Sequence, residues 1–357
     1  MDKNKNLKKY QILRDELLDY IKKNGLKSND KLPTVREILK NSDFSYATLN
    51  RTLIEMENEG SITKRQGKGL FVNRIPPQTK DKQVALILPE HFSNFKIFLD
   101  VLAGVRIALE KANIGLLISI TNMSHEKEKE TIEKLISMRI DGIIIFLEDG
   151  YRKNYSHIKE LKEKNFPFVL IDRYIPELET DYVIVNNTNA IFRICSYLKY
   201  NKNCDKIIFV PEYGKPADVS SSEEKIIAFK NAIKILYGDD DGAIIEFDDL
   251  ILNIEEMSKT YKNLGISLNH DMMISELYKH LQGQNKELPA NCHIFGYNKS
   301  FETPLYPTVE QFNDQVGMKA AEILIAKMNN PNNQIVHIKI EPKLILFDEN
   351  NNFFMES

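Results

Sequence analysis

The sequence predicts an α/β protein in which a small helical domain precedes a larger domain built on parallel sheets. The chain has 357 residues, which corresponds to two or three domains at roughly 100–200 residues each. Hydrophobic residues make up 42% of it and charged residues 28%, as is usual for a globular protein. From residue 83 onward, short apolar runs alternate with amphipathic stretches, a pattern typical of strand–helix–strand units.

Several classes of protein do not fit this composition. No apolar run approaches the roughly 20 residues that a membrane helix needs. The first residues, MDKNKNLKKY, lack the apolar stretch of a signal peptide. The three cysteines, Cys195, Cys204 and Cys292, are scattered and form neither a disulfide framework nor a metal-binding CxxC pair. We therefore expect a cytoplasmic protein that neither crosses nor binds a membrane.

Charge is distributed unevenly along the chain. Residues 1–74 contain 16 Lys and Arg against 10 Asp and Glu, a net charge of +6. The remaining residues, 75–357, contain 32 basic and 41 acidic side chains, a net charge of −9. A basic N-terminal domain on an acidic body suggests that this domain binds a polyanion.

Three helices are predicted in the basic segment. Apolar residues at spacings of three and four predict an amphipathic helix over 7–24, ended by Gly25. A second helix is expected from the stretch LPTVREIL, with Pro33 in its first turn. Ser45 is a suitable N-cap for a third helix, YATLNRTLIEMENEG, which Gly60 ends.

A short hairpin follows these helices. Residues 61–73, SITKRQGKGLFVN, alternate in hydrophobicity around a Gly-Lys-Gly tip. Three helices and a hairpin are the plan of a winged helix-turn-helix domain, which we assign to residues 1–73. Residues 74–82 contain two prolines and several charges but no apolar face, so they are predicted to be a linker to a domain over 83–357.

The first domain resembles the GntR family of bacterial transcription regulators. The residues that carry the resemblance are Leu32 to Glu37 (LPTVRE), Ser45 with Thr48, Met56 to Gly60, and Gly67 to Val72 in the hairpin. They span almost the whole domain in order. The resemblance implies a homodimer that binds double-stranded DNA.

The resemblance also suggests which residues contact DNA. The first turns of a recognition helix reach base edges in the major groove, and here they contain Ser45, Tyr46, Ala47, Thr48 and Asn50. Arg36, on the preceding helix, is placed to reach a phosphate or a guanine. Arg65, Gln66, Gly67 and Lys68 form the slim tip of the hairpin. The family often has Arg where this chain has Tyr46, so a guanine-reading side chain is missing there.

The larger domain resembles the effector domains of LacI/GalR regulators, which are similar to periplasmic sugar-binding proteins. Seven stretches match in order: Val84–Pro89, Phe98 to Gly104, Arg139 to Ile144, Pro167–Arg173, Val185 to Asn187, Phe295 to Asn298, and Pro307 to Val309 with Gln311, followed by Gly317 and Ala320-Ala321. A GntR domain on such a body resembles the arabinose-repressor type of regulator. The resemblance implies two α/β lobes with parallel sheets and a sugar in the cleft between them.

Polar side chains at the ends of predicted strands are candidates for this cleft, since ligands of open α/β sheets bind beyond the carboxyl ends of the strands. The candidates are Glu148, Asp149, Arg173, Asn187, Asp271, Asn298 and Gln311. Phe95 and Phe98 are candidates for stacking on an apolar sugar face. Arg173 is the strongest candidate; the alternative for it is a salt bridge with Asp172 or Glu177. Asn298 replaces an aspartate usual in the family, and Lys225 replaces an arginine.

The functional prediction is a ligand-responsive regulator that represses carbohydrate-utilisation genes. No catalytic motif is present: there is no HExxH, G-x-S-x-G, Walker loop or GxGxxG. We therefore expect neither catalysis nor a cofactor or metal ion. Two alternatives remain at this point: a solute-binding receptor with a non-functional DNA-binding domain, and an enzyme regulated by that domain.

Overall fold

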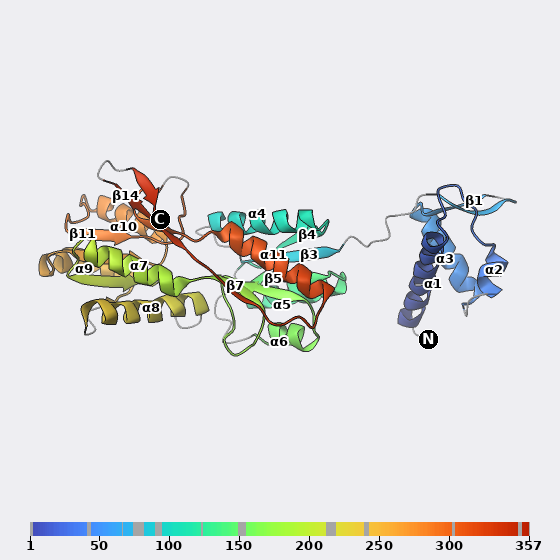
Figure 1. Ribbon diagram of the computed structural model, residues 1–357, viewed down its shortest axis with the longest axis horizontal. Coiled ribbons are helices and arrows are strands. Elements are labelled where there is room, and N and C mark those ends of the chain that lie inside the picture. The colour runs from blue at the N-terminus through green and yellow to red at the C-terminus, as the bar shows by residue number, and fades with distance from the viewer. Residues whose placement is uncertain are drawn as a thin grey trace. The chain divides into compact units, whose positions relative to one another are not determined.

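A computed structural model of the chain separates into two compact units, unit 1 (Met1–Asp81) and unit 2 (Lys82–Ser357) (Figure 1). Residues 74–81, which make up most of the predicted linker, lie outside the part of the chain that the structure describes. The described residues are 3–40, 44–65, 67–73, 82–89, 95–122, 124–148, 155–211, 219–238, 243–301, 304–348 and 352–356.

Unit 1 contains the elements of a winged helix-turn-helix in the predicted order. They are α1 (Lys3–Lys23), α2 (Val35–Lys40), α3 (Tyr46–Asn58), β1 (Ile62–Arg65) and β2 (Gly69–Val72). The two strands pair antiparallel, with Ile62 opposite Val72. One apolar core, which includes Leu18, Leu49 and Met56, joins the helices to the hairpin.

The ends of these helices follow local chemistry. Ser45 caps α3 by accepting a hydrogen bond from the Thr48 N–H, and Gly60 follows α3 with a φ of 74° that favours glycine. The predicted place of Pro33 is wrong, because α2 begins at Val35. Thr34 precedes α2, and the Glu37 carboxylate accepts hydrogen bonds from the Thr34 N–H (2.7 Å) and hydroxyl (2.9 Å), as in a capping box.

Unit 2 begins with a six-stranded parallel sheet in the order β13–β7–β6–β5–β3–β4. Helices α4 (Phe95–Lys111) and α11 (Asn313–Asn329) pack on one face of it, and α5 (His125–Ser137) and α6 (Ser156–Glu163) pack on the other (Figure 1). We call this the N-lobe. Its strands are β3 (Gln83–Leu88), β4 (Gly115–Ile120), β5 (Gly142–Phe146), β6 (Phe168–Ile171), β7 (Tyr182–Val185) and β13 (His337–Ile340).

The C-lobe has a four-stranded parallel sheet in the order β11–β10–β8–β9. Helices α7 (Asn187–Tyr200) and α8 (Ser220–Tyr237) cover one face, and α9 (Phe247–Thr260) and α10 (Asp271–Gly283) cover the other. The strands are β8 (Lys206–Val210), β9 (Ala243–Ile244), β10 (Leu264–Leu268) and β11 (Cys292–Phe295). The central strands of both lobes are buried along almost their whole length because helices cover both faces, which confirms the predicted fold class.

A small antiparallel sheet was not predicted. It consists of β12 (Thr308–Glu310), β14 (Lys343–Phe347) and β15 (Phe353–Met355), in the order β12–β14–β15. Leu344 and Leu346 of β14 join the core beneath α7 and α8. Strands β14 and β15 form a local hairpin, with Phe347 opposite Phe353, whereas β12 joins β14 by long-range pairing, with Thr308 opposite Ile345.

The chain passes between the lobes at β7–α7, at β12–α11 and at β13–β14. The Glu341 carboxylate joins the first and third crossings by accepting hydrogen bonds from the side-chain amides of Asn186 and Asn189, both at 2.6 Å. These hydrogen bonds lower the pKa of Glu341. At the second crossing, Phe312 has a φ of 55°. Among the described helices, none is long and apolar enough to cross a membrane.

Candidate functional site

The exposed face of α3 is the first candidate site. Tyr46 is 63% exposed, and Ala47 and Asn50 also face solvent. Leu49 and Leu53, on the opposite face, are buried against the other helices. This division leaves the first two turns of α3 available to a major groove.

Two predicted contact residues also have a local role. The hydroxyls of Ser45 and Thr48 are hydrogen-bonded to each other at 2.9 Å, and Ser45 Oγ accepts the Thr48 N–H at 3.2 Å. Both side chains thus stabilise the start of α3. Tyr46, Ala47 and Asn50, on the exposed face of α3, remain the stronger candidates for base contact.

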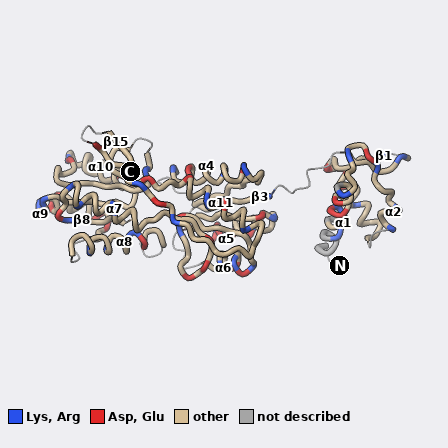
Figure 2. The backbone as a smooth tube through the Cα atoms, viewed as in Figure 1, with Lys and Arg blue, Asp and Glu red and all other residues tan. Residues whose placement is uncertain are grey.

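The hairpin tip and α2 carry the predicted basic contacts (Figure 2). Arg36, Gly67 and Lys68 are exposed. Arg65 donates a hydrogen bond to Asn29 Oδ1 at 2.5 Å, and its guanidinium lies 4.5 Å from the centroid of the Phe71 ring. Gln66 lies outside the described residues.

Sequence reasoning missed one basic neighbour of the hairpin. The backbone of Lys31 forms an isolated antiparallel β-bridge with Phe71. Its side chain lies close to Gly69, with Cε 3.2 Å from where a Cβ would stand there. Its signal in the sequence, one exposed lysine in a loop, was too weak to find it.

The second candidate site is a cavity between the lobes, at the carboxyl ends of the strands. It is small, about 40 Å³, which is room for about three water molecules. Its walls come from both lobes: Ile97, Phe146, Asp172, Arg173, Asn187, Ser221, Ser222, Lys225, Asn269, His270, Asn298 and Gln311. Arg173, Asn187, Asn298 and Gln311 were among the predicted ligand contacts.

Arg173 is 7% exposed and is held by the N-lobe. Its Nη1 donates to the carbonyl oxygen of Leu147 at 2.7 Å, its Nε lies 3.6 Å from an Asp172 carboxylate oxygen, and its guanidinium lies 5.2 Å from the centroid of the Phe146 ring. The pairing with Asp172, which was the alternative for Arg173, therefore coexists with its place in the cavity wall.

Gln311 lies at the second crossing and is 4% exposed. Its Nε2 donates a hydrogen bond to Asn298 Oδ1. Its Oε1 has no hydrogen-bond partner among the described residues. A buried amide oxygen without a partner costs free energy, so this oxygen is suited to accept a hydrogen bond from a ligand.

Five cavity residues that the sequence did not identify as contacts come from the C-lobe: Ser221, Ser222, Lys225, Asn269 and His270. Lys225 Nζ donates to Asn269 Oδ1 at 3.2 Å and lies 3.9 Å from the centroid of the Tyr297 ring. Ser222 and His270 lie at the N-termini of α8 and α10. Of Ser222, Lys225 and His270, only Lys225 could have been found from the sequence, because it stands where the family has an arginine.

The other predicted ligand contacts are not brought to the cavity. The Glu148 carboxylate is buried and accepts a hydrogen bond from the Thr121 hydroxyl, while the Glu148 N–H donates to Glu128 Oε2 at 3.0 Å. Phe98 packs in the N-lobe core with its ring edge-on to Phe146. Asp149 and the side chain of Phe95 lie outside the described part of the chain.

Asp271 is also turned away from the cavity. Its carboxylate accepts hydrogen bonds from the Thr308 hydroxyl (2.7 Å) and the Ser300 N–H (2.8 Å), so it organises the loop after β11. Burial raises the pKa of Asp271 to about 7, although these hydrogen bonds favour the carboxylate. Its role here is to hold the loop that contains Asn298.

Replacing Asp271 with Asn should change how stability depends on pH. The folded state keeps the Asp271 proton up to about pH 7, whereas the unfolded chain loses it near pH 4. Asp271 therefore stabilises the fold most at low pH, and as the pH rises from about 4 to 7 it reduces the free energy of unfolding by up to about 4 kcal/mol.

Urea denaturation at several pH values measures this effect. The difference in unfolding free energy between wild type and Asp271→Asn should move in favour of the variant between pH 5 and pH 8. A difference that stays constant with pH would show that Asp271 is already ionised at pH 5.

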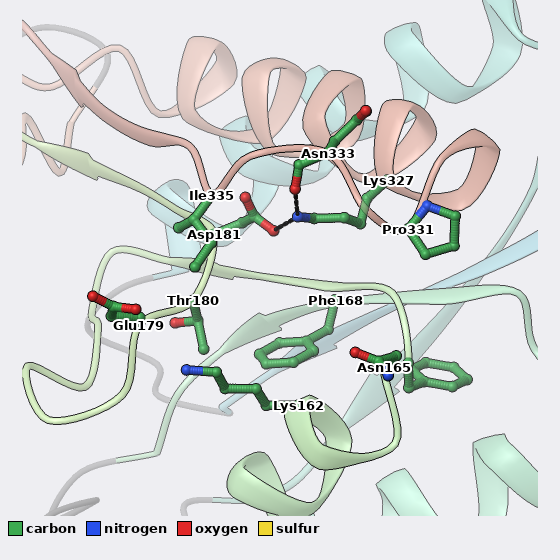
Figure 3. Close-up of a pocket in the computed structure, with 11 residues that line it drawn as sticks. Lys162, Asn165, Phe168, Glu179, Thr180, Asp181, Lys327, Pro331, Asn333 and Ile335 are labelled. Atoms are coloured by element: carbon green, nitrogen blue, oxygen red, sulfur yellow. Dashed lines mark hydrogen bonds and ion pairs between the residues drawn. The ribbon is translucent and has the colours of Figure 1, made fainter.

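A larger cavity of about 200 Å³ lies at the opposite edge of the N-lobe (Figure 3). Phe168 at the start of β6 and Thr180 before β7 line it, and Lys327 Nζ lies 3.0 Å from an Asp181 carboxylate oxygen at its rim. It lies at the amino ends of the parallel strands. Because ligands of such sheets bind at the carboxyl ends, the interlobe cavity is the better candidate despite its size.

The described residues contain no group of three His, Cys, Asp or Glu side chains that could hold a metal ion. The buried thiols of Cys195 and Cys204 are also unsuited to act as ligands, because burial raises their pKa well above the ordinary value.

Comparison with known proteins decides the family. Residues 9–72 match the model of bacterial regulatory proteins of the gntR family. Unit 1 is therefore a DNA-binding domain of the GntR type. The resemblance predicted from LPTVRE and the hairpin is thereby confirmed.

The similarity to curated proteins extends beyond unit 1. An arabinose metabolism transcriptional repressor of Geobacillus stearothermophilus is 29% identical over 199 residues, which are 55% of this chain and about half (54%) of the relative. A second protein of that description, from Halalkalibacterium halodurans, is 21% identical over 336 residues, 89% of this chain and 88% of the relative. These relatives are transcription regulators rather than enzymes.

Unit 2 of the regulator has the fold of LacI-type effector domains. A periplasmic binding protein/LacI transcriptional regulator from Alkaliphilus metalliredigens, solved with D-xylulofuranose, matches with a TM-score of 0.60 and 21% identity. The match covers 74% of this chain and 97% of that one. The predicted two-lobed fold is therefore confirmed.

Proposed function

We propose that this regulator represses carbohydrate-utilisation genes in the bacterial cytoplasm, binds operator DNA through α3 and the hairpin, and is controlled by a sugar-class ligand in the interlobe cavity. The observation that carries this is a polar cavity with walls from both lobes on a chain whose N-terminal unit is a GntR domain. The amides of Asn187, Asn298 and Gln311 suit sugar hydroxyls, which both donate and accept hydrogen bonds.

Control operates through the angle between the lobes. The cavity is small, about 40 Å³, so we expect a sugar to change the angle between the lobes when it binds. They are joined at three crossings, and Asn187 and Gln311 lie at two of them. A ligand that contacts these residues binds the open and closed lobes with different affinity, which is what linkage to DNA binding needs.

The edge of the N-lobe supports a homodimer. Strand β4 is the edge strand of the six-stranded sheet, and its Leu117, Ile118 and Ile120 are 36%, 47% and 55% exposed. Leu99 of α4 is also 48% exposed. An apolar edge strand left open invites pairing with another chain, and a second copy there supplies the second DNA-binding domain that a symmetric operator requires.

Binding to duplex DNA from the gene's own neighbourhood tests the function. We expect two chains per duplex and affinity that falls steeply with salt. Lys68→Ala should weaken binding to all sequences alike and reduce the log–log salt slope by about 1.8, because each of the two bound chains loses one phosphate contact. Lys259→Ala, a change of equal charge on the exposed surface of α9, serves as the control and should leave the slope unchanged.

A wild-type chain that ignores these duplexes at low salt would contradict the regulator proposal. If it still bound a sugar, the alternative of a solute-binding receptor with a non-functional DNA-binding domain would hold. If Lys68→Ala leaves the salt slope unchanged, the hairpin does not contact the DNA phosphates, and the rest of the proposal stands.

A further inference from the structure

The charges in the wall of the interlobe cavity exceed what a neutral sugar needs. Arg173 and Lys225 both line it and are only 7% and 6% exposed. Asp172 is the single carboxylate among the lining residues, and it lies against Arg173. The described wall therefore has a net positive charge even with His270 neutral. A positive, poorly solvated cavity favours an anion.

Helix termini add to this positive potential. Asn187 is the first residue of α7, Ser221 and Ser222 lie in the first turn of α8, and His270 immediately precedes α10. Three helix N-termini thus meet at one small cavity, and each contributes partial positive charge. The Asn186 side chain caps α7 by accepting the Asn189 N–H, whereas α8 and α10 have no side-chain cap. The residue before α8 is Val219, whose side chain has no oxygen with which to cap that helix.

A second, independent observation points to a ligand that also carries hydroxyl groups. Gln311 Oε1 is buried in the cavity wall and has no partner among the described residues. Asn298, which Gln311 contacts, lies beside it. An anion alone would not satisfy this acceptor, whereas a hydroxyl donates to it.

We infer that the cavity binds a polyol that carries one anionic group, a phosphate or a carboxylate. Arg173, Lys225 and the N-terminus of α8 hold the anionic group, and Gln311 with Asn298 holds the hydroxyls. Arginine and lysine form stronger, charge-assisted hydrogen bonds with such oxygens. This inference rests on the proposed function, since it names the chemical class of ligand for the same cavity.

Thermal unfolding and calorimetric titration of the full chain test the inference. The probes are D-ribose, D-ribose 5-phosphate and D-ribonate, the matching set D-glucose, D-glucose 6-phosphate and D-gluconate, and inorganic phosphate alone. We expect saturable binding of at least one anionic sugar, at least tenfold tighter than its neutral parent, and weaker binding of inorganic phosphate. Comparing the sugar phosphates with the sugar acids shows whether the anionic group is a phosphate or a carboxylate.

Lys225→Gln should weaken binding of the anionic probes at least tenfold, and by a larger factor than it weakens binding of the neutral parent sugar. Lys225→Arg should keep most of the affinity because it keeps the charge, which also shows that the site folds. Lys230→Gln, an exposed position on the same helix, is the matched control and should change nothing.

The outcomes distinguish failure of the anionic-ligand inference from failure of the proposed regulator function. Neutral D-ribose or D-glucose could bind saturably and at least as tightly as its anionic forms. That result overturns the inference that the ligand is anionic, but it leaves the proposal of a sugar-responsive regulator intact. Anionic probes that bind Lys225→Gln as tightly as wild type also overturn it. No saturable binding by any of the seven probes overturns it too, whereas failure to bind duplex DNA overturns the regulator itself.

Discussion

Replacing Arg173 with alanine should weaken effector binding at least tenfold and leave DNA binding by the ligand-free chain intact. Arg173 is buried in the cavity wall, and its guanidinium can donate several hydrogen bonds to a ligand. Losing a charged hydrogen bond costs about 1.5–3 kcal/mol, and partners left unpaired increase the loss. The contacts with Leu147, Asp172 and Phe146 all lie within the N-lobe, so the DNA-binding unit should not be affected.

Release of a labelled operator by the sugar that stabilises the wild-type chain measures this effect. Arg173→Lys keeps the charge but not the planar guanidinium. The sugar concentration that releases the operator from it should lie between those for the alanine variant and wild type. An alanine variant that responds at the wild-type sugar concentration would place the ligand elsewhere. One that fails to bind the operator at all would mean that Arg173 chiefly holds the lobes together.

Replacing Gly317 with alanine should destabilise unit 2 strongly. Gly317 on α11 faces Val101 on α4, and a Cβ at Gly317 would lie 2.1 Å from the Val101 carbonyl oxygen. A Cβ at Gly104 would lie 1.8 Å from the Asp314 carbonyl oxygen. The two helix backbones touch at these glycines, and backbone atoms cannot rotate away as a side chain can. We expect a loss of about 3 kcal/mol or more for either glycine, at the upper end of overpacking effects.

Urea denaturation with Gly283→Ala as the control checks this prediction. Gly283 ends α10 and has nothing within 4 Å of its Cβ position, so alanine there should be neutral or stabilise the helix by up to about 1 kcal/mol. Because α11 begins directly after Gln311 and Phe312, a displaced α11 should also alter ligand affinity. Equal midpoints for Gly317→Ala and wild type would show that the helices do not approach so closely.

Much of the fold was predictable because it depends on short-range chemistry. The cap at Ser45 and the positive φ at Gly60 act over a few residues, so α3 was predicted with the correct start and an end within two residues. The apolar runs of β5 and β6 reflect helices on both faces of a parallel sheet. The pairing of β12 with β14 could not be predicted because it joins residues far apart in the chain. The hairpin of β14 and β15 is local, and the sequence analysis missed it.

The candidate cleft was predictable only in part. Arg173, Asn187 and Asn298 were found because each lies at a strand end, and the carboxyl ends of parallel strands meet at one edge. Strand-end position does not say where a side chain points. Glu148 and Asp271 meet that criterion but turn into the protein, where Thr121 and Thr308 hydrogen-bond to their carboxylates.

By itself, the sequence determined a basic winged helix-turn-helix unit, a two-lobed parallel α/β body and the strand ends that line its cleft, because periodicity, caps and apolar runs act locally. Only the tertiary structure decided which polar groups gather there. Lys225, Ser222 and His270 reach the cavity because the N-termini of α8 and α10 converge on it. The two N-termini converge because β8 and β10, which precede these helices, pair in parallel, and no single stretch of sequence encodes that pairing.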